Sequence, residues 1–253
     1  MRKSVLGVAW IVIITAALTM VSWTPIKRDS VQNIAVTANS SIFNQQIQQI
    51  YDTALLEQSG LSLAVFKKAA RGFYNLKNAG KVSEGKSILS IADFDLSSKK
   101  KRFWIVDLDQ EKLLINTWVA HGTYSGGDKA TDFSNTRESQ KSSIGFYVTG
   151  ESYYGKHGLS LRLDGMDEGF NSNARERAIV VHGADYVSQH TIDVLGRLGR
   201  SQGCPAVPQE LASTVVQTMG GRTVLFINAT LPQYTSPYLD YSWETLASNS
   251  NIM

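Results

Sequence analysis

The sequence is short of cysteine and of proline. Its 253 residues include one cysteine, Cys204, and five prolines. A single thiol cannot form an internal disulfide, and it cannot supply a zinc site that needs two or more thiolates. Charged residues make up 19% of the chain and hydrophobic residues 43%, which excludes a disordered or collagen-like protein. We therefore expect a globular chain with a self-sufficient core.

A large excess of one charge is also missing. The formal net charge is +3, and Arg2 and Lys3 at the N-terminus contribute two of these charges, so the remainder carries +3 − 2 = +1. So small a charge gives no reason to expect a nucleic-acid partner. The basic run Lys99 to Arg102 is most simply explained as a solvated turn, and a contact with an anionic polymer is the alternative.

Charges are absent from a long stretch near the N-terminus. Arg2 and Lys3 are followed by Ser4 to Trp23, which are uncharged and largely apolar. A short basic start before an apolar run is typical of a secretory signal, and the run is also long enough to cross a bilayer as a helix. We predict that residues 1–23 are a signal peptide or a membrane anchor, the anchor being residues 5–23. The protein is then exported to the periplasm or cell envelope.

The rest of the chain divides into regions by its hydrophobic pattern. Residues 24–40 have little periodicity and are predicted to be a linker, and residues 41–82 have the three- and four-residue spacing of two packed helices. Residues 83–230 alternate as short strands do, with helical patterns at 187–199 and 208–219. Residues 231–253 form a predicted tail. The expected fold is mainly β with a short N-terminal helical segment. The expected strands are 88–94, 103–108, 112–120, 143–149, 160–163, 177–182 and 222–228.

One pair of residues points to chemistry. An apolar strand delivers His182 at its end, and Cys204 follows 204 − 182 = 22 residues later between Gly203 and Pro205. A cysteine nucleophile needs a nearby base or positive charge, which His182 can provide. The amides of Gly203 and Cys204 are then candidates to face a developing oxyanion. A helix that starts at Pro205 would also lower the thiol pKa through its dipole.

The order of motifs around this pair resembles a known family. The chain is similar to the murein L,D-transpeptidases of the YkuD type, in the branch with Gly-Arg-Ser-x-Gly-Cys-Pro-Ala. That motif stands here at 199–206, and His-Gly-Ala-Asp-Tyr precedes it at 182–186. The resemblance covers roughly residues 85–230. Further segments that carry it are Val119-Ala120-His121-Gly122, Phe133-Ser134-Asn135, Ser142 to Tyr147 and Gly155-Lys156-His157-Gly158.

The resemblance implies a β-rich catalytic domain and cysteine-dependent acyl transfer on peptidoglycan stem peptides, without a metal or organic cofactor. By position, Cys204 matches the nucleophile and His182 its base. Gly183 matches the residue whose carbonyl orients the imidazole. Ser201 and Gly203 match the serine and the glycine of the signature.

Two positions depart from the family pattern. Gln202 stands where the wider family usually has His, and Ala206 stands where it usually has Arg or Asn. The charge that holds a substrate carboxylate must therefore come from elsewhere. Two histidines that precede glycines could also line the cleft. The candidate substrate-binding residues are Arg200, Arg197, His121, His157 and Gln202.

Several functions share these residues. An amine acceptor makes the enzyme an L,D-transpeptidase, whereas water as acceptor makes it an L,D-carboxypeptidase; both begin with a thioester on Cys204. A non-catalytic murein-binding homologue is a further alternative. A zinc amidase or peptidase is disfavoured because His-x-His, His-x-x-x-His and His-Glu-x-x-His spacings are missing. The pattern does not predict an oligomeric state.

Overall fold

The structure is a computed structural model that describes residues 28–240, with side chains from residue 41 onward. The predicted signal or anchor at residues 1–23 lies outside the described residues, as does the end of the predicted tail. By its contacts the chain divides into a unit of residues 1–39 and a unit of residues 40–253. Within the described part, no helix has both the length and the apolar character needed to cross a membrane.

Two helices precede the sheet in the chain. Helix α2 (Arg28–Thr53) begins earlier than its hydrophobic spacing indicates, because the predicted linker is helical from Arg28 onward. Helix α3 (Leu63–Asn78) begins after Ser62, whose Oγ accepts a hydrogen bond of 3.3 Å from the amide of Val65. It ends at Asn78, and Gly80 follows the capping residue Ala79 with a φ of +66°, the left-handed conformation that glycine adopts most easily.

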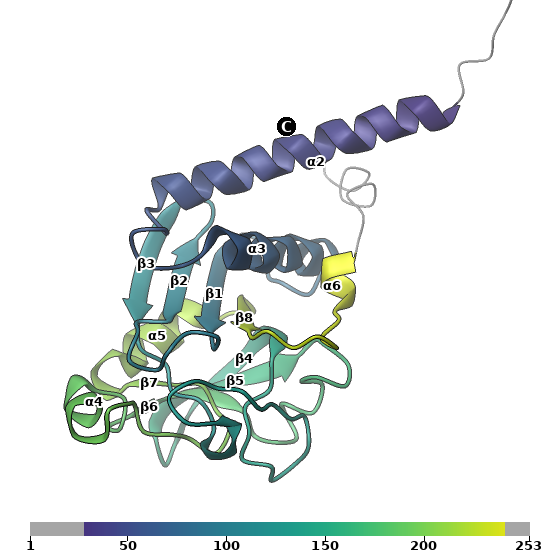
Figure 1. Ribbon diagram of the computed structural model, residues 1–253. Helices are drawn as coiled ribbons and strands as arrows, with labels where there is room; N and C mark the ends of the chain where they lie inside the picture. The colour runs from purple at the N-terminus through teal and green to yellow at the C-terminus, as the bar shows by residue number, and fades with distance from the viewer. Residues whose placement is uncertain (1–27, 241–253) are drawn as a thin grey trace, which may run out of the picture. The chain divides into compact units, whose positions relative to one another are not determined.

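A sheet of eight strands forms the body of the second unit, in the order β3-β2-β1-β8-β4-β5-β6-β7. The first and last strands of the chain, β1 and β8, are parallel neighbours in the middle of the sheet, so segments far apart in the sequence meet there (Figure 1). Strands β6 and β7 are also parallel. The strands are β1 (Ile88–Asp93), β2 (Phe103–Asp107), β3 (Lys112–Thr117), β4 (Gly145–Gly155), β5 (Gly158–Gly165), β6 (Val180–Ala184), β7 (Ala206–Pro208) and β8 (Val224–Asn228). The mainly β fold is therefore confirmed.

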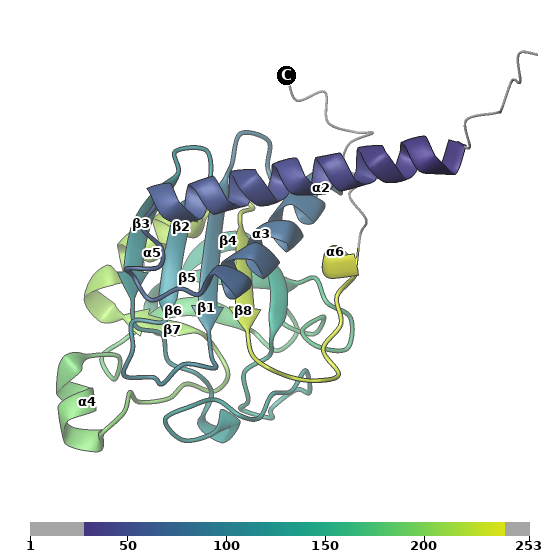
Figure 2. The ribbon, with the colours of Figure 1, turned by 45° about the horizontal axis from the view of Figure 1, so that its top comes forward.

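The helices cover the two faces of this sheet. Along β8, Val224 and Phe226 point toward α3, whereas Leu225 and Ile227 pack with α5 (Ala212–Met219) on the other face. Figure 2 shows α3 in front of β1 and β8, with α5 behind the sheet. This alternation is the period of two that a strand buried on both faces must have.

The prediction of a helix that starts at Pro205 is wrong. The chain instead runs on from Cys204 as β7, an edge strand, and α5 begins only after the short 3₁₀ turn η2 (Gln209–Leu211). An edge strand tolerates Pro208, which cannot donate a ladder hydrogen bond. Cys204 is therefore not at a helix N-terminus, and no helix dipole lowers its pKa.

A buried carboxylate holds the segment that follows β8. Asp167 is fully buried and accepts hydrogen bonds from the amide of Phe146 at 2.7 Å, from the Tyr234 hydroxyl at 2.7 Å and from the Ser236 hydroxyl at 2.6 Å. The short helix α6 (Pro237–Asp240) follows and lies beside α3, where the Tyr238 carbonyl accepts from the Asn75 amide at 2.7 Å (Figure 1).

Candidate active site

The loop that carries Cys204 is built on the segment that follows β3. Backbone amides and carbonyls join the two: Ala120 donates to Ala206 at 2.8 Å, Ser201 donates to His121 at 3.0 Å, and Thr123 donates to Ser201 at 2.8 Å. The segment at 120–123 thus acts as an extra strand that fixes the loop on both sides of the cysteine.

Ser201 and Gly203 fix the turn that precedes the cysteine. The Ser201 hydroxyl donates to the carbonyl of Cys204 at 2.6 Å and accepts from the amide of Gly203 at 3.1 Å. Gly203 has a φ of +116°, and a Cβ there would lie 2.7 Å from the carbonyl oxygen of Lys141. Glycine is required for both reasons. Since the Gly203 amide already donates to Ser201, it is not the oxyanion donor that the sequence suggested.

The imidazole of His182 is held in a defined tautomer. His182 is 3% exposed, and its Nδ1 lies 2.8 Å from the carbonyl oxygen of Gly183. A carbonyl can only accept, so Nδ1 carries the proton and Nε2 keeps its lone pair. Burial lowers the pKa of His182, and the nearby charges of His157 and Lys156 lower it further against the opposing effect of the Gly183 carbonyl. The ring is therefore a neutral base at neutral pH.

The thiol of Cys204 lies against the strand that bears His182. Its Sγ accepts from the amide of Val180 at 3.5 Å and lies 3.7 Å from the carbonyl oxygen of Ala178. Burial raises the pKa of the thiol, while the Val180 amide and the charges of Arg177 and Lys156 act in the opposite direction. The resting pair is therefore a protonated thiol and a neutral imidazole.

Both side chains open into one cavity of about 900 Å³. In the register of β6 and β7, His182 pairs with Ala206, so Cys204 lies two residues further back, beside Val180. Val180, His182 and Cys204 all line the cavity, which places the base and the thiol on the same side of this strand pair. The predicted site residues that line it are Cys204, His182, Ser201, Gln202, Arg200 and His157.

Two predicted substrate-binding residues are not at the cavity. His121 is 1% exposed, and its Nδ1 lies 2.8 Å from Nη2 of Arg102, which can only donate. Burial, together with the charge of Arg102, lowers the pKa of His121 to about 4. Arg197 donates to the neighbouring Leu198 carbonyl at 2.7 Å and is also not a lining residue. Both assignments are corrected: His121 supports the fold beneath the cysteine loop, and Arg197 lies outside the cavity.

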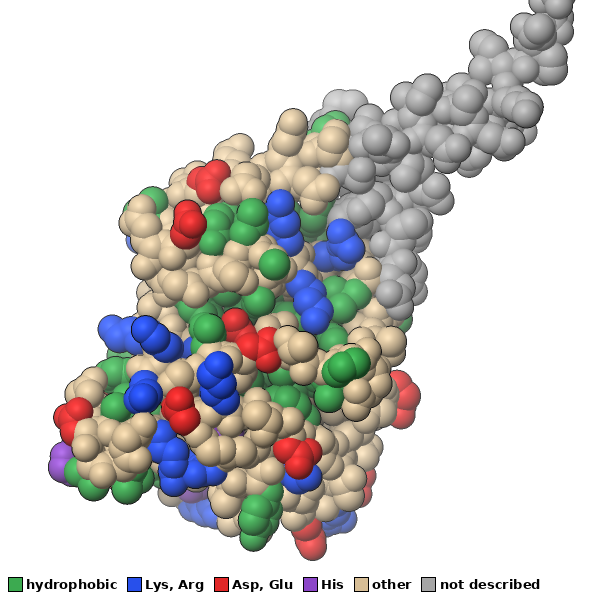
Figure 3. Space-filling view, viewed as in Figure 1, with side chains coloured by type: hydrophobic (Ala, Val, Ile, Leu, Met, Phe, Trp, Pro, Cys, Tyr) green, Lys and Arg blue, Asp and Glu red, His purple; other side chains and the backbone are tan. Residues whose placement is uncertain are grey.

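The basic run at 99–102 divides between surface and core. Lys99, Lys100 and Lys101 are exposed as expected, but Arg102 is fully buried. Its guanidinium donates to the carbonyls of Leu96 and Val119 as well as to His121. In the view of Figure 3, several Lys and Arg side chains gather on the left of the molecule, the side where α4 (Gln189–Leu195) lies. The prediction of a solvated turn therefore fails for Arg102 alone.

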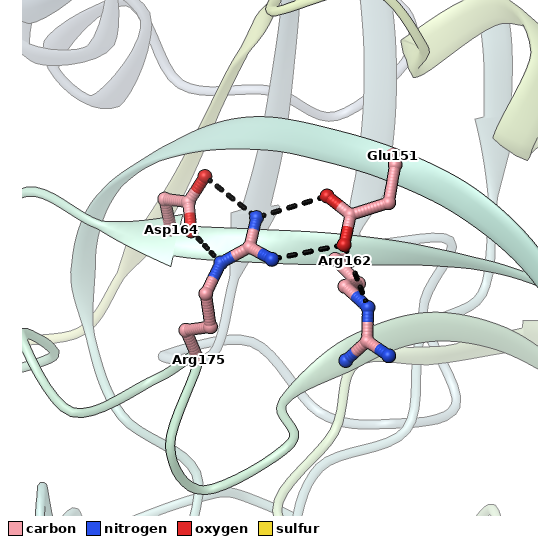
Figure 4. A network of polar contacts seen from close by, with 4 residues as sticks. All are labelled: Glu151, Arg162, Asp164 and Arg175. Carbon is pink, nitrogen blue, oxygen red and sulfur yellow. Dashed lines mark hydrogen bonds and ion pairs between the residues drawn. The ribbon is translucent and has the colours of Figure 1, made fainter.

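The hairpin of β4 and β5 forms one wall of the cavity. An ionic network at its base joins both strands to the following loop, with Arg175 between Glu151 and Asp164 and with Arg162 also on Glu151 at 2.9 Å (Figure 4). Hydrogen bonds from Arg175 lower the pKa of Glu151 to about 2. Ion pairs thus hold β4, β5 and the following loop together.

The tip of that hairpin brings two further side chains to the cavity. Gly155 pairs with Gly158, which leaves Lys156 and His157 as the two central residues of the turn. The ring of His157 stacks on that of His182, with 4.3 Å between centroids and 23° between planes. The tip of the hairpin therefore lies directly over the ring of His182.

Sequence reasoning missed Lys156 and Arg177, which both line the cavity. Lys156 stood within a segment that carried the family resemblance, but the sequence did not show that it lines the same cavity as Cys204. Arg177 was assigned to the start of a strand. Among residues 41–240, no three His, Cys, Asp or Glu side chains gather in a way that could hold a metal ion.

Comparisons with known proteins bear on this site. A family model described as the L,D-transpeptidase catalytic domain matches residues 57–228, which is more than half of the chain. A search of curated proteins finds no match.

Solved structures with a similar fold include an L,D-transpeptidase from Mycobacterium smegmatis, at 13% identity and a TM-score of 0.36, with 57% of this chain and 60% of that chain covered. Another is the helical cell shape determining protein Pgp2 (K307A mutant) from Campylobacter jejuni, at 12% identity and a TM-score of 0.39, with 64% and 57% covered. A third is L,D-transpeptidase 1 from Mycobacterium tuberculosis, at 11% identity and a TM-score of 0.33, with 57% and 63% covered. The chain thus spans less than two thirds of the length of each.

Proposed function

Because the chain belongs to the L,D-transpeptidase catalytic domain family, we propose that it transfers acyl groups between peptidoglycan stem peptides through a thioester on Cys204. The observation that carries this proposal is the pairing, in one cavity, of a thiol with an imidazole whose Nε2 lone pair is free. A nucleophile, a base and a group that orients the base are the parts that covalent acyl transfer needs.

The first step follows from the protonation states of the resting site. Nε2 of His182 takes the proton of the Cys204 thiol as the sulfur attacks the carbonyl carbon of the third residue of a tetrapeptide stem. The Gly183 carbonyl stabilises the imidazolium that forms, because it accepts from Nδ1 at 2.8 Å. The charge of Arg177, which lowers the pKa of the thiol, also favours the thiolate as it develops.

The tetrahedral intermediate places a negative charge on the carbonyl oxygen. The amide of Cys204 makes no hydrogen bond to any described residue, so it is available to donate to that oxygen. When the intermediate collapses, the bond from carbon to the leaving nitrogen breaks, and the imidazolium of His182 gives its proton to the departing amine. A thioester on Cys204 and a free terminal amino acid result.

The second half-reaction repeats these roles in reverse. His182 takes a proton from an amine of a second stem as the nitrogen attacks the thioester, and the thiol leaves protonated. The product is a cross-link between two stems. Water in place of the amine would release a tripeptide, so the acceptor decides between transpeptidase and carboxypeptidase. We further propose that the reaction takes place outside the cytoplasm, as the basic and apolar pattern of residues 1–23 predicts.

The test uses a defined tetrapeptide stem, with and without an acceptor stem, and analysis of the products by mass. We expect a cross-linked dimer and a thioester adduct on the intact protein. Replacing Cys204 with Ala should remove both, while Lys100→Gln, an exposed change outside the cavity, should leave both intact. An undiminished adduct in Cys204→Ala contradicts the proposal, and tripeptide as the sole product would make the enzyme a carboxypeptidase.

A further inference from the structure

The cavity is lined by more cationic than anionic side chains, and the proposed reaction steps do not require most of these cations. Its lining includes four cationic side chains, Arg137, Lys156, Arg177 and Arg200, together with the carboxylates of Glu138 and Glu176. A donor stem ends in a free carboxylate, which needs a cation near the point of attack. The family position that could supply one is Ala206, which is fully buried in β7.

Arg177 already has partners for both terminal nitrogens. Nη1 donates to the carbonyl of Ser134 at 2.6 Å and to the hydroxyl of Ser143 at 3.2 Å. Nη2 donates to the hydroxyl of Ser139 at 3.2 Å and to the carbonyl of Lys141 at 2.6 Å. The guanidinium therefore braces the loop behind Gly203, and binding a substrate would require it to give up these bonds.

The other two arginines are also engaged. Nη1 of Arg200 donates to the carbonyl of Gly126 and, at 3.4 Å, to that of Thr123. Arg137 forms an ion pair of 3.5 Å with Glu176. Each of these cations thus has an acceptor within the protein.

Lys156 differs from them. It is exposed at the turn of the β4–β5 hairpin, and its ammonium has no acceptor or ion-pair partner among the described residues. Its charge nonetheless reaches the reacting groups, because it lowers the pKa of both Cys204 and His182. Among the four cations that line the cavity, Lys156 is therefore the one whose N–H donors are all free to bind a ligand.

We propose that Lys156 binds the terminal carboxylate of the donor stem and so selects stems that end in a free acid. This assignment rests on the proposed acyl-transfer function. The carboxylate carbon of the leaving residue is three bonds from the carbon that Cys204 attacks. A protein cation that binds this carboxylate must therefore lie close to the thiol. A lysine suits this place, since its compact charge on a flexible stem can follow the carboxylate as the leaving group departs.

The experiment compares two tetrapeptide stems that differ only at the end, one with a free carboxylate and one with a carboxamide. The ratio of their kcat/KM values measures how strongly the enzyme recognises the carboxylate. We expect the wild-type protein to prefer the free acid by about tenfold, a typical effect of one charge-assisted hydrogen bond. Lys156→Gln should abolish the preference by slowing the free acid alone, whereas Lys156→Arg should retain most of it.

Controls keep this result separate from the chemical step. Lys100→Gln removes an exposed lysine outside the cavity and should leave the ratio unchanged. The dissociation constants of both stems, measured in the Cys204→Ala background with and without Lys156→Gln, test recognition without turnover. An equal preference in wild-type protein and Lys156→Gln, by either measurement, overturns the role of Lys156. A preference in binding that Lys156→Gln removes, without any turnover by the wild-type protein, would overturn the acyl-transfer function alone.

Discussion

Two of the three His-Gly pairs of this protein look alike in the sequence but have different roles in the structure. His121-Gly122 and His182-Gly183 both follow apolar stretches, and both histidines are almost fully buried, at 1% and 3% exposure. The partner of Nδ1 separates them. At His182 the partner is a carbonyl, which leaves a lone pair on Nε2, whereas at His121 it is the donor Arg102, which forces the proton onto Nε2.

The partner of one ring nitrogen of a histidine thus decides whether the other nitrogen can accept a proton. His182 can accept a proton at the cavity because its other nitrogen already donates one. His121 has its lone pair occupied by a fixed cation, and its Nε2 has no hydrogen-bond partner within the described residues. It therefore cannot act as a base at neutral pH, and its pKa of about 4 expresses the same fact. The predictions below test this contrast.

The largest effect is expected from His182→Gln. Without a base, the protonated thiol of Cys204 cannot be activated, so we expect kcat/KM to fall by about 10³-fold, in the range typical of general-base removal. Thermal stability should change little, and acylation of the protein can be followed by intact mass. His190→Gln on the exposed α4 is the matched control. If His182→Gln acylates at more than a tenth of the wild-type rate, His182 is not the base.

The next effect is on stability and comes from Arg102→Met. The change keeps much of the side-chain volume but leaves the carbonyls of Leu96 and Val119 without their buried donor. We expect a loss of about 3 kcal/mol in the free energy of unfolding, measured with urea, because each unsatisfied buried group costs about 1–3 kcal/mol. Lys101→Met, one residue away and exposed, should cost less than about 0.5 kcal/mol. Equal losses in the two variants would contradict a structural role for the buried guanidinium.

A third test uses pH. The folded pKa of His121 is about 4, below the value of about 6.5 in an unfolded chain, so the unfolded state binds more protons between these values. Stability from this residue is complete above pH 6.5 and is lost as the pH falls toward 4. We expect the wild-type protein to lose about 2 kcal/mol more between pH 7 and pH 5 than His121→Gln, which can still accept from Arg102. Parallel stability curves for the two proteins would show that His121 does not titrate in this way.

Much of the fold could be predicted because its signals are local. The alternation of β1, β2, β3 and β8 and the helical spacing of α3 are properties of neighbouring residues. The short strand β7 was missed because it is defined by pairing with β6 and with Ala120, both distant in sequence. Pro205 indicated a helix start, but tertiary pairing overrode that preference, which is the usual limit of local propensity.

The site divides in the same way. Cys204, Ser201, Gly203 and His182 lie in motifs whose spacing can be recognised, and the structure brings them together around one loop. The place of His121 depends on Arg102, and the place of Lys156 depends on which residues form the turn of a hairpin. Neither contact leaves a pattern in the nearby sequence, so the sequence alone could not predict the surroundings of His121 or Lys156. The contrast between His121 and His182 likewise becomes visible only when the structure shows the partner of each Nδ1.

The smallest effect is expected where the hairpin touches the base. The ring of His157 stacks on that of His182, with 4.3 Å between their centroids. Burial is the main cause that lowers the pKa of His182, and the charge of His157 lowers it further. His157→Ala removes this charge and exposes the ring beneath it, so the pKa of His182 should rise. The acid limb of the pH profile of kcat/KM should then move to higher pH, with a loss of only a few fold at the optimum. His157→Phe preserves the stacking surface but not the charge, so it should shift the limb less than His157→Ala. An unchanged limb in both variants would mean that the hairpin tip does not set the basicity of His182, and that the Gly183 carbonyl and burial are sufficient.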